Sequence, residues 1–286
     1  MQVISATNII TAPAKYRSPL RYPGGKQKAI SRIAAMLPPR AREYREPMVG
    51  GGSVYLYARS ISLSESYWIN DRFPELTVFW QIVQQRAMCE SLQKDLHALR
   101  NKLKTAREIK KFFLKAREEE PKDSYQIALL FFFFNRVTFS GTTRAGGFSS
   151  AASVHRFTAS SIDRLAQLPE ALDGTRITNV DCLEVIEAPG RDVFIFLDPP
   201  YYTASKLYGR NGSLHQFDHE KLARSLSKTK HRFLITYDDC DEIRKLYDGA
   251  TIKKCNVREW QLQYGMNNCN SENTSKIGSE LFISNY

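Results

Sequence analysis

The feature that most limits the fold is an uninterrupted apolar stretch, 193–197, which runs directly into Asp198, two prolines and Tyr201. Five apolar residues in a row before a turn are typical of a strand buried on both faces of a parallel sheet. Strand-like segments at 41–46, 68–71, 176–180 and 233–237 are separated by segments of helical character at 26–37, 54–60, 74–118 and 125–134. Strands that alternate with helices predict an α/β fold with a mostly parallel sheet.

The charge of the chain is concentrated in two segments. The 286 residues include 41 Lys and Arg against 30 Asp and Glu, for a formal charge of +11. Residues 1–40 and 81–164 each carry +7, whereas residues 165–286 sum to −2. The second block has helical periodicity, so it predicts a folded cationic module for a polyanion, with basic residues of 86–122 available to phosphates. No apolar run is long enough to span a bilayer. A membrane surface is disfavoured because the charge does not form a cationic amphipathic anchor.

The cysteines and histidines argue against metal and disulfide chemistry. The cysteine count is five, an odd number, and no C-x-x-C occurs, which disfavours a disulfide framework or a structural zinc site. His215 and His219 are four residues apart, but Gln216 stands where a zinc peptidase motif needs Glu, so we expect no metal. With no apolar core of a signal peptide near residue 1, we expect a cytoplasmic protein.

A glycine-rich turn lies between the predicted strand 41–46 and the helix that follows it. Gly50, Gly51 and Gly52 would let a ligand approach the backbone closely, and a helix start favours an anion. Asp71 follows about twenty residues later at a second strand end, where a carboxylate can accept hydrogen bonds from a ribose. The turn lacks the complete G-x-G-x-x-G pattern, and Gly24-Gly25-Lys26 lacks the Ser or Thr of a P-loop. The pattern therefore indicates a nucleoside-bearing cofactor, with a purely structural turn as the alternative.

The turn after 193–197 offers hydrogen-bond acceptors only. Prolines have no amide hydrogen, so the available polar groups are the Asp198 carboxylate and the carbonyls of Asp198 and Pro199. Tyr201 adds a flat aromatic surface. This set suits a planar aromatic amine, held through its N–H groups and stacked on the ring. The alternative is an ordinary proline-rich turn that ends a strand.

Taken together, these segments resemble the Dam-like family of DNA adenine-N6 methyltransferases. Residues 21–26 resemble its aromatic-x-Gly-Gly-Lys motif, and 46–53 its cofactor motif, with Gly51 where many members carry Ala. Asp71 matches its ribose-binding acid, and residues 198–201 match its catalytic Asp-Pro-Pro-Tyr tetrad. Residues 135–141 resemble the start of its DNA-reading hairpin, with Ser140 in place of a common Asn. The resemblance covers roughly residues 16–286.

The resemblance implies a Rossmann-like S-adenosylmethionine-dependent methyltransferase sheet with an inserted, mostly helical target-recognition domain. It places a flexible arm at residues 1–15, the catalytic domain at 16–72 and 165–286, and target recognition at 73–164. The implied cofactor is S-adenosylmethionine, and the implied catalytic residues are Asp198, Pro199, Pro200 and Tyr201. Cofactor-binding residues are expected to be Tyr22, Lys26, Pro47, Gly50, Gly52, Ser53, Asp71, Asp181 and Asp198.

The expected substrate is double-stranded DNA, from which the target adenine is flipped out of the helix. The candidate DNA contacts are Asn135, Arg136, Ser140, Thr142 and Arg144. The four phenylalanines from Phe131 to Phe134 are interpreted as packing of a helix. We expect a monomer in solution, and a cognate restriction endonuclease as partner is left open.

Two alternative functions stay open from the sequence alone. Cytosine-N4 methylation uses a similar acceptor geometry, but its turn typically has Ser where this chain has Asp198. A catalytically silent DNA-binding module would keep the fold without turnover. RNA or protein as the substrate is also compatible, because the tetrad binds a planar amine and not the polymer that carries it.

Overall fold

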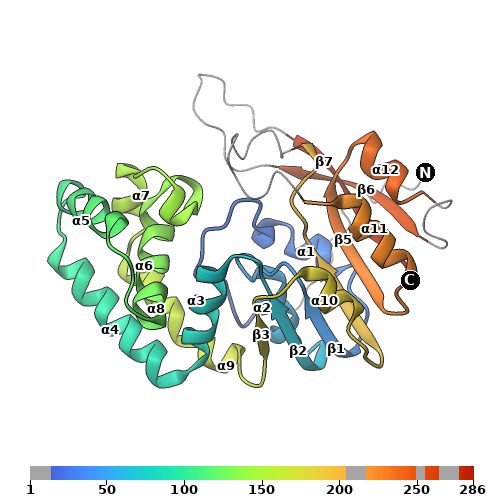
Figure 1. Ribbon diagram of the computed structural model, residues 1–286, viewed down its shortest axis with the longest axis horizontal. Helices are drawn as coiled ribbons and strands as arrows, with labels where there is room; N and C mark the ends of the chain where they lie inside the picture. Colours follow the sequence, from blue (N-terminus) through green and yellow to red (C-terminus); the bar gives the residue numbers. More distant parts are fainter. Residues whose placement is uncertain (1–13, 204–216, 249–254, 264–276) are drawn as a thin grey trace. The chain divides into compact units, whose positions relative to one another are not determined.

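The computed structural model describes residues 14–203, 217–248, 255–263 and 277–286 (Figure 1). The chain divides into two compact units, which we describe separately. Unit 1 contains Ser31–Met48 and the described residues from Asp181 onward, and unit 2 contains residues 14–30 and Val49–Val180.

Unit 1 is built on five strands in the spatial order β1, β4, β5, β7, β6. These are β1 (Ala41–Glu46), β4 (Val193–Leu197), β5 (Arg232–Asp238), β6 (Asn256–Gln263) and β7 (Ile277–Ser284). β1, β4 and β5 run parallel, whereas β7 is antiparallel to both β5 and β6. The three parallel strands therefore end at one edge, where Pro47, Asp198 and Asp239 follow them.

The core of unit 1 lies between the sheet and its helices. These are α1 (Ile30–Ala34), α10 (Cys182–Glu187), α11 (His219–Lys228) and α12 (Asp241–Leu246). The apolar side chains of α11, Leu222, Ala223 and Leu226, pack with β4 and β5 in one buried cluster. All five residues of β4 are buried, which explains its uninterrupted apolar sequence.

Unit 2 pairs β2 (Ser64–Asn70) with β3 (Arg176–Thr178) in parallel. The 3-10 turn η1 (Lys26–Lys28) and helix α2 (Ser53–Ser60) flank the glycine turn, and α3 (Pro74–Gln84) follows β2. Pro74 occupies the first position of α3, where the missing amide hydrogen costs no helical hydrogen bond. α9 (Leu168–Ala171) precedes β3.

The remainder of unit 2 is a helical cluster (Figure 1). It comprises α4 (Arg86–Lys102), α5 (Ala106–Glu118), α6 (Ser124–Val137), η2 (Phe139–Gly141), η3 (Thr143–Ala145), α7 (Ser150–His155), α8 (Ala159–Asp163) and η4 (Arg164–Gln167). Caps define its helices: Thr105 and Glu108 form a capping box on α5, and Asp123 caps α6. Phe131 to Phe134 are all buried, which confirms that this run packs α6.

Three details differ from the sequence expectations. The expected helix 26–37 is a 3-10 turn followed by the short α1, which ends at Ala34. The helix expected to end at Phe134 continues to Val137, so Asn135 and Arg136 are helical. The antiparallel strands β6 and β7 had no counterpart among the expected elements. The expected arm of residues 1–15 lies almost entirely outside the described residues. No helix in the described part of the chain is long and apolar enough to cross a membrane.

Candidate active site

The Asp-Pro-Pro-Tyr turn lies at the carboxyl end of β4, as expected from the sequence. Asp198 is partly buried, Pro199 is buried, and Pro200 and Tyr201 are partly buried. The hydroxyl of Thr236 on the adjacent strand β5 donates to Asp198 Oδ1 at 2.8 Å. Thr236 is itself fully buried, so this bond restricts the orientation of the carboxylate.

A second residue of β5 fastens the chain immediately after the tetrad. Asp238 Oδ1 accepts a hydrogen bond from the Tyr202 amide at 3.0 Å, and Oδ2 accepts from the Thr203 amide at 2.8 Å. The Thr203 hydroxyl also donates to Asp238 Oδ2. Asp238 is 7% exposed, so these bonds satisfy a buried carboxylate while they fix the exit of the turn.

His219, the first residue of α11, lies beside this exit. Its Nδ1 is 2.8 Å from the Tyr237 hydroxyl, and its ring contacts those of Tyr202 and Phe217. Burial lowers the pKa of His219 below its usual value of 6.5, although Asp238 and Asp218 act in the opposite direction. His215 lies outside the described residues, and within those residues no group of three potential metal ligands occurs.

The glycine turn belongs to unit 2 and packs against Tyr22. Gly50 has φ +47°, in the left-handed region that favours glycine. A Cβ on Gly50 would lie 2.8 Å from Tyr22 Cε1, and one on Gly51 would lie 2.9 Å from Tyr22 Cβ. An Ala at position 51 would therefore fit only if Tyr22 moved. On the other side, the buried Trp80 side chain donates to the Gly50 carbonyl at 3.3 Å.

Asp71, directly after β2, contacts the same turn. Its Oδ2 accepts from the Gly50 amide at 2.9 Å and its Oδ1 from the Phe73 amide at 3.0 Å. Burial raises the pKa of Asp71, and the hydrogen bonds from Phe73, Gly50 and Arg72 oppose that shift. Each carboxylate oxygen has a further lone pair that a ligand hydroxyl can use. Unit 2 thus brings together Tyr22, Gly50 and Asp71.

The other candidate cofactor residues occupy different positions. Lys26 is 4% exposed, and its Nζ donates to the Gly24 carbonyl at 3.1 Å. Ser53 begins α2 directly after Gly52, which has φ +69°. In unit 1, Pro47 is buried at the end of β1, and Asp181 caps α10 by accepting from the Leu183 amide at 2.9 Å. The cap gives Asp181 a structural function in addition to the predicted one.

Asn135 holds two distant segments of unit 2 together. Its side chain is fully buried, accepts from the Arg21 amide at 2.9 Å, and donates to the Arg21 carbonyl at 2.6 Å. It also donates to the Gly141 carbonyl at 3.2 Å. Gly141 has φ +76°, and a Cβ there would lie 2.1 Å from the Arg21 carbonyl oxygen. This arrangement fixes the loop that begins after α6.

The remaining candidate DNA contacts lie on or beside this loop. Arg136 is 5% exposed and donates to the carbonyls of Arg156 and Pro19. Arg144 donates to the carbonyls of Arg117 and Glu119 at the end of α5. Ser140 is partly buried with φ +53°, and Thr142 is exposed. In place of hairpin strands, the loop has two 3-10 turns closed by a bridge between Thr138 and Phe148.

Sequence reasoning missed Thr236, Asp238 and Trp80. Thr236 and Asp238 are the polar residues at the end of the apolar run of β5, and polar residues at that edge of a parallel sheet are a usable signal. Trp80 carries no such signal, because its sequence context in α3 is that of an ordinary buried helix residue.

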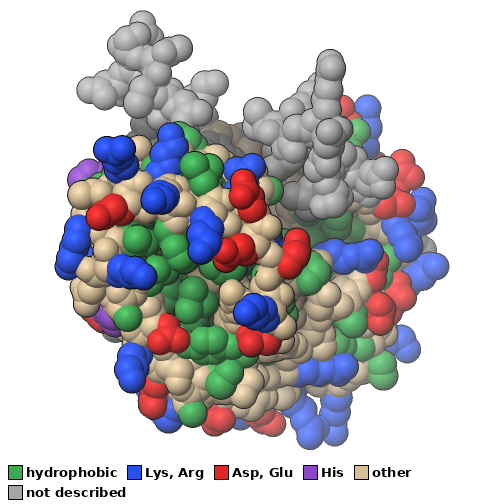
Figure 2. All heavy atoms as spheres, turned by 60° about the vertical axis from the view of Figure 1, so that its left-hand side comes forward, with side chains coloured by type: hydrophobic (Ala, Val, Ile, Leu, Met, Phe, Trp, Pro, Cys, Tyr) green, Lys and Arg blue, Asp and Glu red, His purple; other side chains and the backbone are tan. Residues whose placement is uncertain are grey.

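The basic residues of 86–122 do not form a continuous patch in the view of Figure 2. Lys and Arg side chains there are scattered among acidic and hydrophobic side chains over α4 and α5. Their predicted contact with phosphates stays a prediction.

Comparison with known proteins identifies the family. The family model described as D12 class N6 adenine-specific DNA methyltransferase matches residues 22–261, which include the glycine turn, Asp71 and the tetrad. The chain belongs to this family. The predicted assignment to the Dam-like DNA adenine methyltransferases is thereby confirmed, and the cytosine-N4 and silent-module alternatives are not favoured.

Curated relatives of this D12 methyltransferase are similar over most of its length. It is 26% identical to the type II methyltransferase M.MjaIII of Methanocaldococcus jannaschii, covering 93% of this chain and 98% of that protein. It is 28% identical to a DNA adenine methylase of Vibrio cholerae, over 83% of this chain and 87% of the relative. A solved rRNA methyltransferase, aviRa of Streptomyces viridochromogenes, covers 98% of this chain and 91% of its own at 13% identity, with a TM-score of 0.41.

The α/β fold class expected from the sequence is confirmed by the parallel strands of each unit and by membership of the D12 family. The family also implies a methyl donor and a DNA substrate for this chain. The predicted site residues and domain boundaries stay predictions.

Proposed function

We propose that this D12 methyltransferase transfers a methyl group from S-adenosylmethionine to N6 of an adenine flipped out of duplex DNA. The observation that carries the proposal is the acceptor turn at the end of β4, where Thr236 holds the Asp198 carboxylate at 2.8 Å. The same assignment is supported by relatives named for adenine methylation of DNA.

The glycine turn and Asp71 fit a nucleoside-bearing cofactor. Gly50 has a left-handed backbone and no side chain, and a Cβ at this position would clash with Tyr22. The Asp71 carboxylate accepts a hydrogen bond from the amide of the same glycine. By their positions in the family motifs, we assign the cofactor to Tyr22, Lys26, Pro47, Gly50, Gly52, Ser53, Asp71 and Asp198. Asp181 is added because it follows the strand β3. When bound, S-adenosylmethionine supplies an electrophilic methyl group on a positively charged sulfur.

The chain's own contribution is to position and polarise the adenine amine. The amine is a weak nucleophile because its lone pair is delocalised into the ring. Asp198 and the Pro199 carbonyl accept hydrogen bonds from its two hydrogens, which favours a lone pair directed out of the ring plane. Tyr201 stacks on the flipped base and replaces stacking lost from the duplex. The catalysis is positioning and electrostatic stabilisation, with no covalent enzyme intermediate.

The direct test is incubation of the protein with labelled S-adenosylmethionine and mixed-sequence duplex DNA, followed by analysis of the nucleosides. We expect N6-methyladenine. Label in N4-methylcytosine, or cofactor binding with no labelled base across many sequences, would contradict the proposal. Sequencing that detects methylated bases in DNA from a host expressing the chain would then give the recognition sequence.

The variant Asp198→Ala should abolish transfer and keep the fold, because Asp198 is partly exposed at the end of β4 and the Thr236 hydroxyl can still donate to the Leu197 carbonyl. Circular dichroism and a melting temperature close to that of the wild type are the control for folding. Turnover by Asp198→Ala would reject the catalytic assignment, and cofactor binding by this variant would place the loss in the chemical step.

A further inference from the structure

A cavity of about 350 Å³ in unit 2 is lined by basic and hydroxyl side chains. Its charged residues are Arg21, Arg136, Arg156 and Arg164, and His155 joins them. Ser18, Ser53, Thr158 and Ser160 supply hydroxyls, and none of the lining residues is acidic. The fold brings Arg21 next to three arginines of residues 136–164, so positive charge is concentrated here.

None of these four guanidinium groups is neutralised within the part of the chain that the structure describes. The ion pairs of unit 2 there include Lys15–Glu170, His97–Asp163, Lys115–Glu119 and Arg144–Glu120, and none of them involves the four arginines. The groups that do accept from the arginines are neutral carbonyls: Arg21 donates to Thr138, and Arg136 to Pro19 and Arg156. Carbonyl acceptors satisfy N–H groups but leave the net charge of the cluster uncompensated.

Burial and the other three arginines act on Arg136 in the same direction. It is 5% exposed, and burial together with Arg21, Arg164 and Arg156 lowers its pKa to about 9. It therefore remains charged at neutral pH. Burial, with Arg156 acting in the same direction, also lowers the pKa of Arg21. Packing like charges without a counter-ion is unfavourable unless an anion occupies the site.

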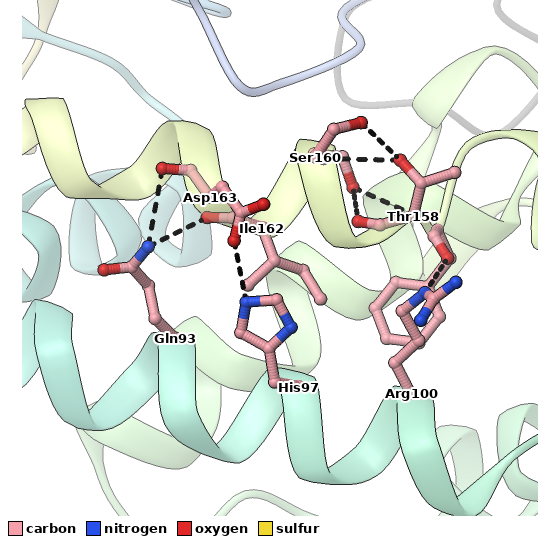
Figure 3. A network of polar contacts seen from close by, with 9 residues as sticks. Gln93, His97, Arg100, Thr158, Ser160, Ile162 and Asp163 are labelled. Carbon is pink, nitrogen blue, oxygen red and sulfur yellow. Dashed lines mark hydrogen bonds and ion pairs between the residues drawn. The ribbon is translucent and has the colours of Figure 1, made fainter.

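The hydroxyl side of the cavity is held in place by α4 (Figure 3). Gln93 donates to the Ile162 carbonyl at 3.2 Å, and His97 Nε2 lies 2.9 Å from Asp163 Oδ1. Arg100 donates to the Phe157 carbonyl at 3.3 Å. These contacts fix α8 and the turn before it, so Thr158 and Ser160, whose hydroxyls are 3.2 Å apart, lie on a supported backbone.

We propose that Arg21, Arg136, Arg156 and Arg164 form a binding site for one phosphodiester group of the DNA backbone. Arg156 and Arg164 are exposed and contact the phosphate oxygens directly. Buried Arg136 supplies fixed positive charge beneath them. Guanidinium groups suit this ligand because their N–H groups match the spacing of phosphate oxygens. The proposal rests on DNA as the substrate of the proposed function.

The alternative anion for this site is the carboxylate of the cofactor. Ser53 supports this alternative, because it lines the cavity and also belongs to the cofactor motif 46–53. We favour DNA because three of the four arginines lie at 136–164, well outside the cofactor motifs. A second cavity of unit 2, of about 560 Å³, does not share this uncompensated positive charge. Its lining contains Arg59 and Arg86 together with the acidic residues Glu170 and Asp173.

The test uses Arg156→Gln/Arg164→Gln in the full chain, with a fluorescein-labelled duplex that contains the methylated sequence. Both side chains are exposed, so the fold should survive. We expect DNA affinity to fall about tenfold or more, because hydrogen bonds to a charged group are lost. The slope of log affinity against log salt should become shallower by about 0.9 for the one phosphate contact. Affinity for S-adenosylmethionine should stay as in the wild type.

The matched control is Lys228→Gln/Lys230→Gln, which removes two exposed positive charges from unit 1. It should leave DNA affinity and the salt slope close to those of the wild type. A double variant with an unchanged salt slope overturns the site. A double variant with weakened cofactor binding and unchanged DNA binding assigns the anion to the cofactor instead. Absence of DNA binding by the wild type would reject the proposed function itself.

Scanning the duplex with neutral methylphosphonate linkages, one at a time, locates the phosphate. For the wild type, one position should weaken binding by about the same factor as the double variant. For the double variant, the same substitution should have little further effect, because the contact is already absent. Equal losses at that position in both proteins would overturn the proposal.

Discussion

The hydroxyl of Thr236 lies 2.8 Å from Asp198 Oδ1, across the parallel pair of β4 and β5. Thr236 is fully buried, whereas Asp198 is partly exposed at the sheet edge. A buried donor on a neighbouring strand therefore sets the orientation of the Asp198 carboxylate, which we propose accepts a hydrogen bond from the adenine amine. Thr236 acts as a positioning residue, because it contacts Asp198 and not the substrate.

Thr236→Val should lower kcat about tenfold or more while KM for DNA stays close to that of the wild type. The change removes a hydrogen bond to a charged group and keeps a side chain of similar shape. The measurement is steady-state methylation of a duplex that contains the recognition sequence. Thr236→Ser keeps the hydroxyl and should restore most of the rate, whereas a purely structural role would lower the melting temperature of both variants together.

The turn after β4 could be predicted from sequence because its signal is local. The apolar run 193–197 and the two prolines of the tetrad define the strand, its end and its acceptors within eight residues. β6 was not predicted because its sequence, Asn-Val-Arg-Glu-Trp-Gln-Leu-Gln, carries mixed polar residues that suit an edge strand exposed on one side. Thr236 was missed because its partner is 38 residues away in the chain.

The loop after α6 was misjudged for a related reason. Polar Asn135 and Arg136 resemble the start of an exposed loop, yet both are buried helical residues. Their partners, Arg21 and Pro19, lie 114 and 117 residues earlier in the chain. Patterns in a single sequence report on residues that are close in the chain. A polar side chain that is buried by hydrogen bonds to distant residues is therefore predicted to be exposed.

Gly50→Ala should destabilise the protein and weaken binding of S-adenosylmethionine. The new Cβ would require a left-handed backbone, at a cost of about 1–2 kcal/mol, and would lie 2.8 Å from Tyr22 Cε1. Urea unfolding measures the free energy of unfolding, and isothermal titration measures the cofactor affinity.

Gly174→Ala is the matched control for Gly50→Ala. Gly174 has φ +65°, but nothing lies within 4 Å of its Cβ position. It should show the cost of the left-handed backbone alone and keep the cofactor affinity. Equal losses of cofactor affinity in the two variants would show that the contact between the glycine turn and Tyr22 is unimportant.

Asn135→Ala should lower the free energy of unfolding by about 1–3 kcal/mol, because buried polar groups of Arg21 and Gly141 lose their partners. Chemical denaturation measures this loss. Thr142→Ala, on the exposed part of the same loop, should change stability by less than about 0.5 kcal/mol. If Asn135→Ala kept full stability and changed only which DNA sequence is methylated, Asn135 would be a base-reading residue and not a structural one.

His219 should make the stability of the protein depend on pH. Burial lowers the pKa of His219 below 6.5 in the folded protein, whereas an unfolded chain protonates this histidine near 6.5. Between these two values the unfolded chain binds more protons, so stability is lost as the pH falls below about 6.5. In His219→Gln, the melting temperature should therefore fall less between pH 7.5 and pH 5.5 than it does in the wild type. The melting temperature of the variant at pH 7.5 accounts for any packing lost around Tyr202 and Tyr237. An identical pH dependence in the two proteins would show that His219 takes up its proton equally in the folded and unfolded states.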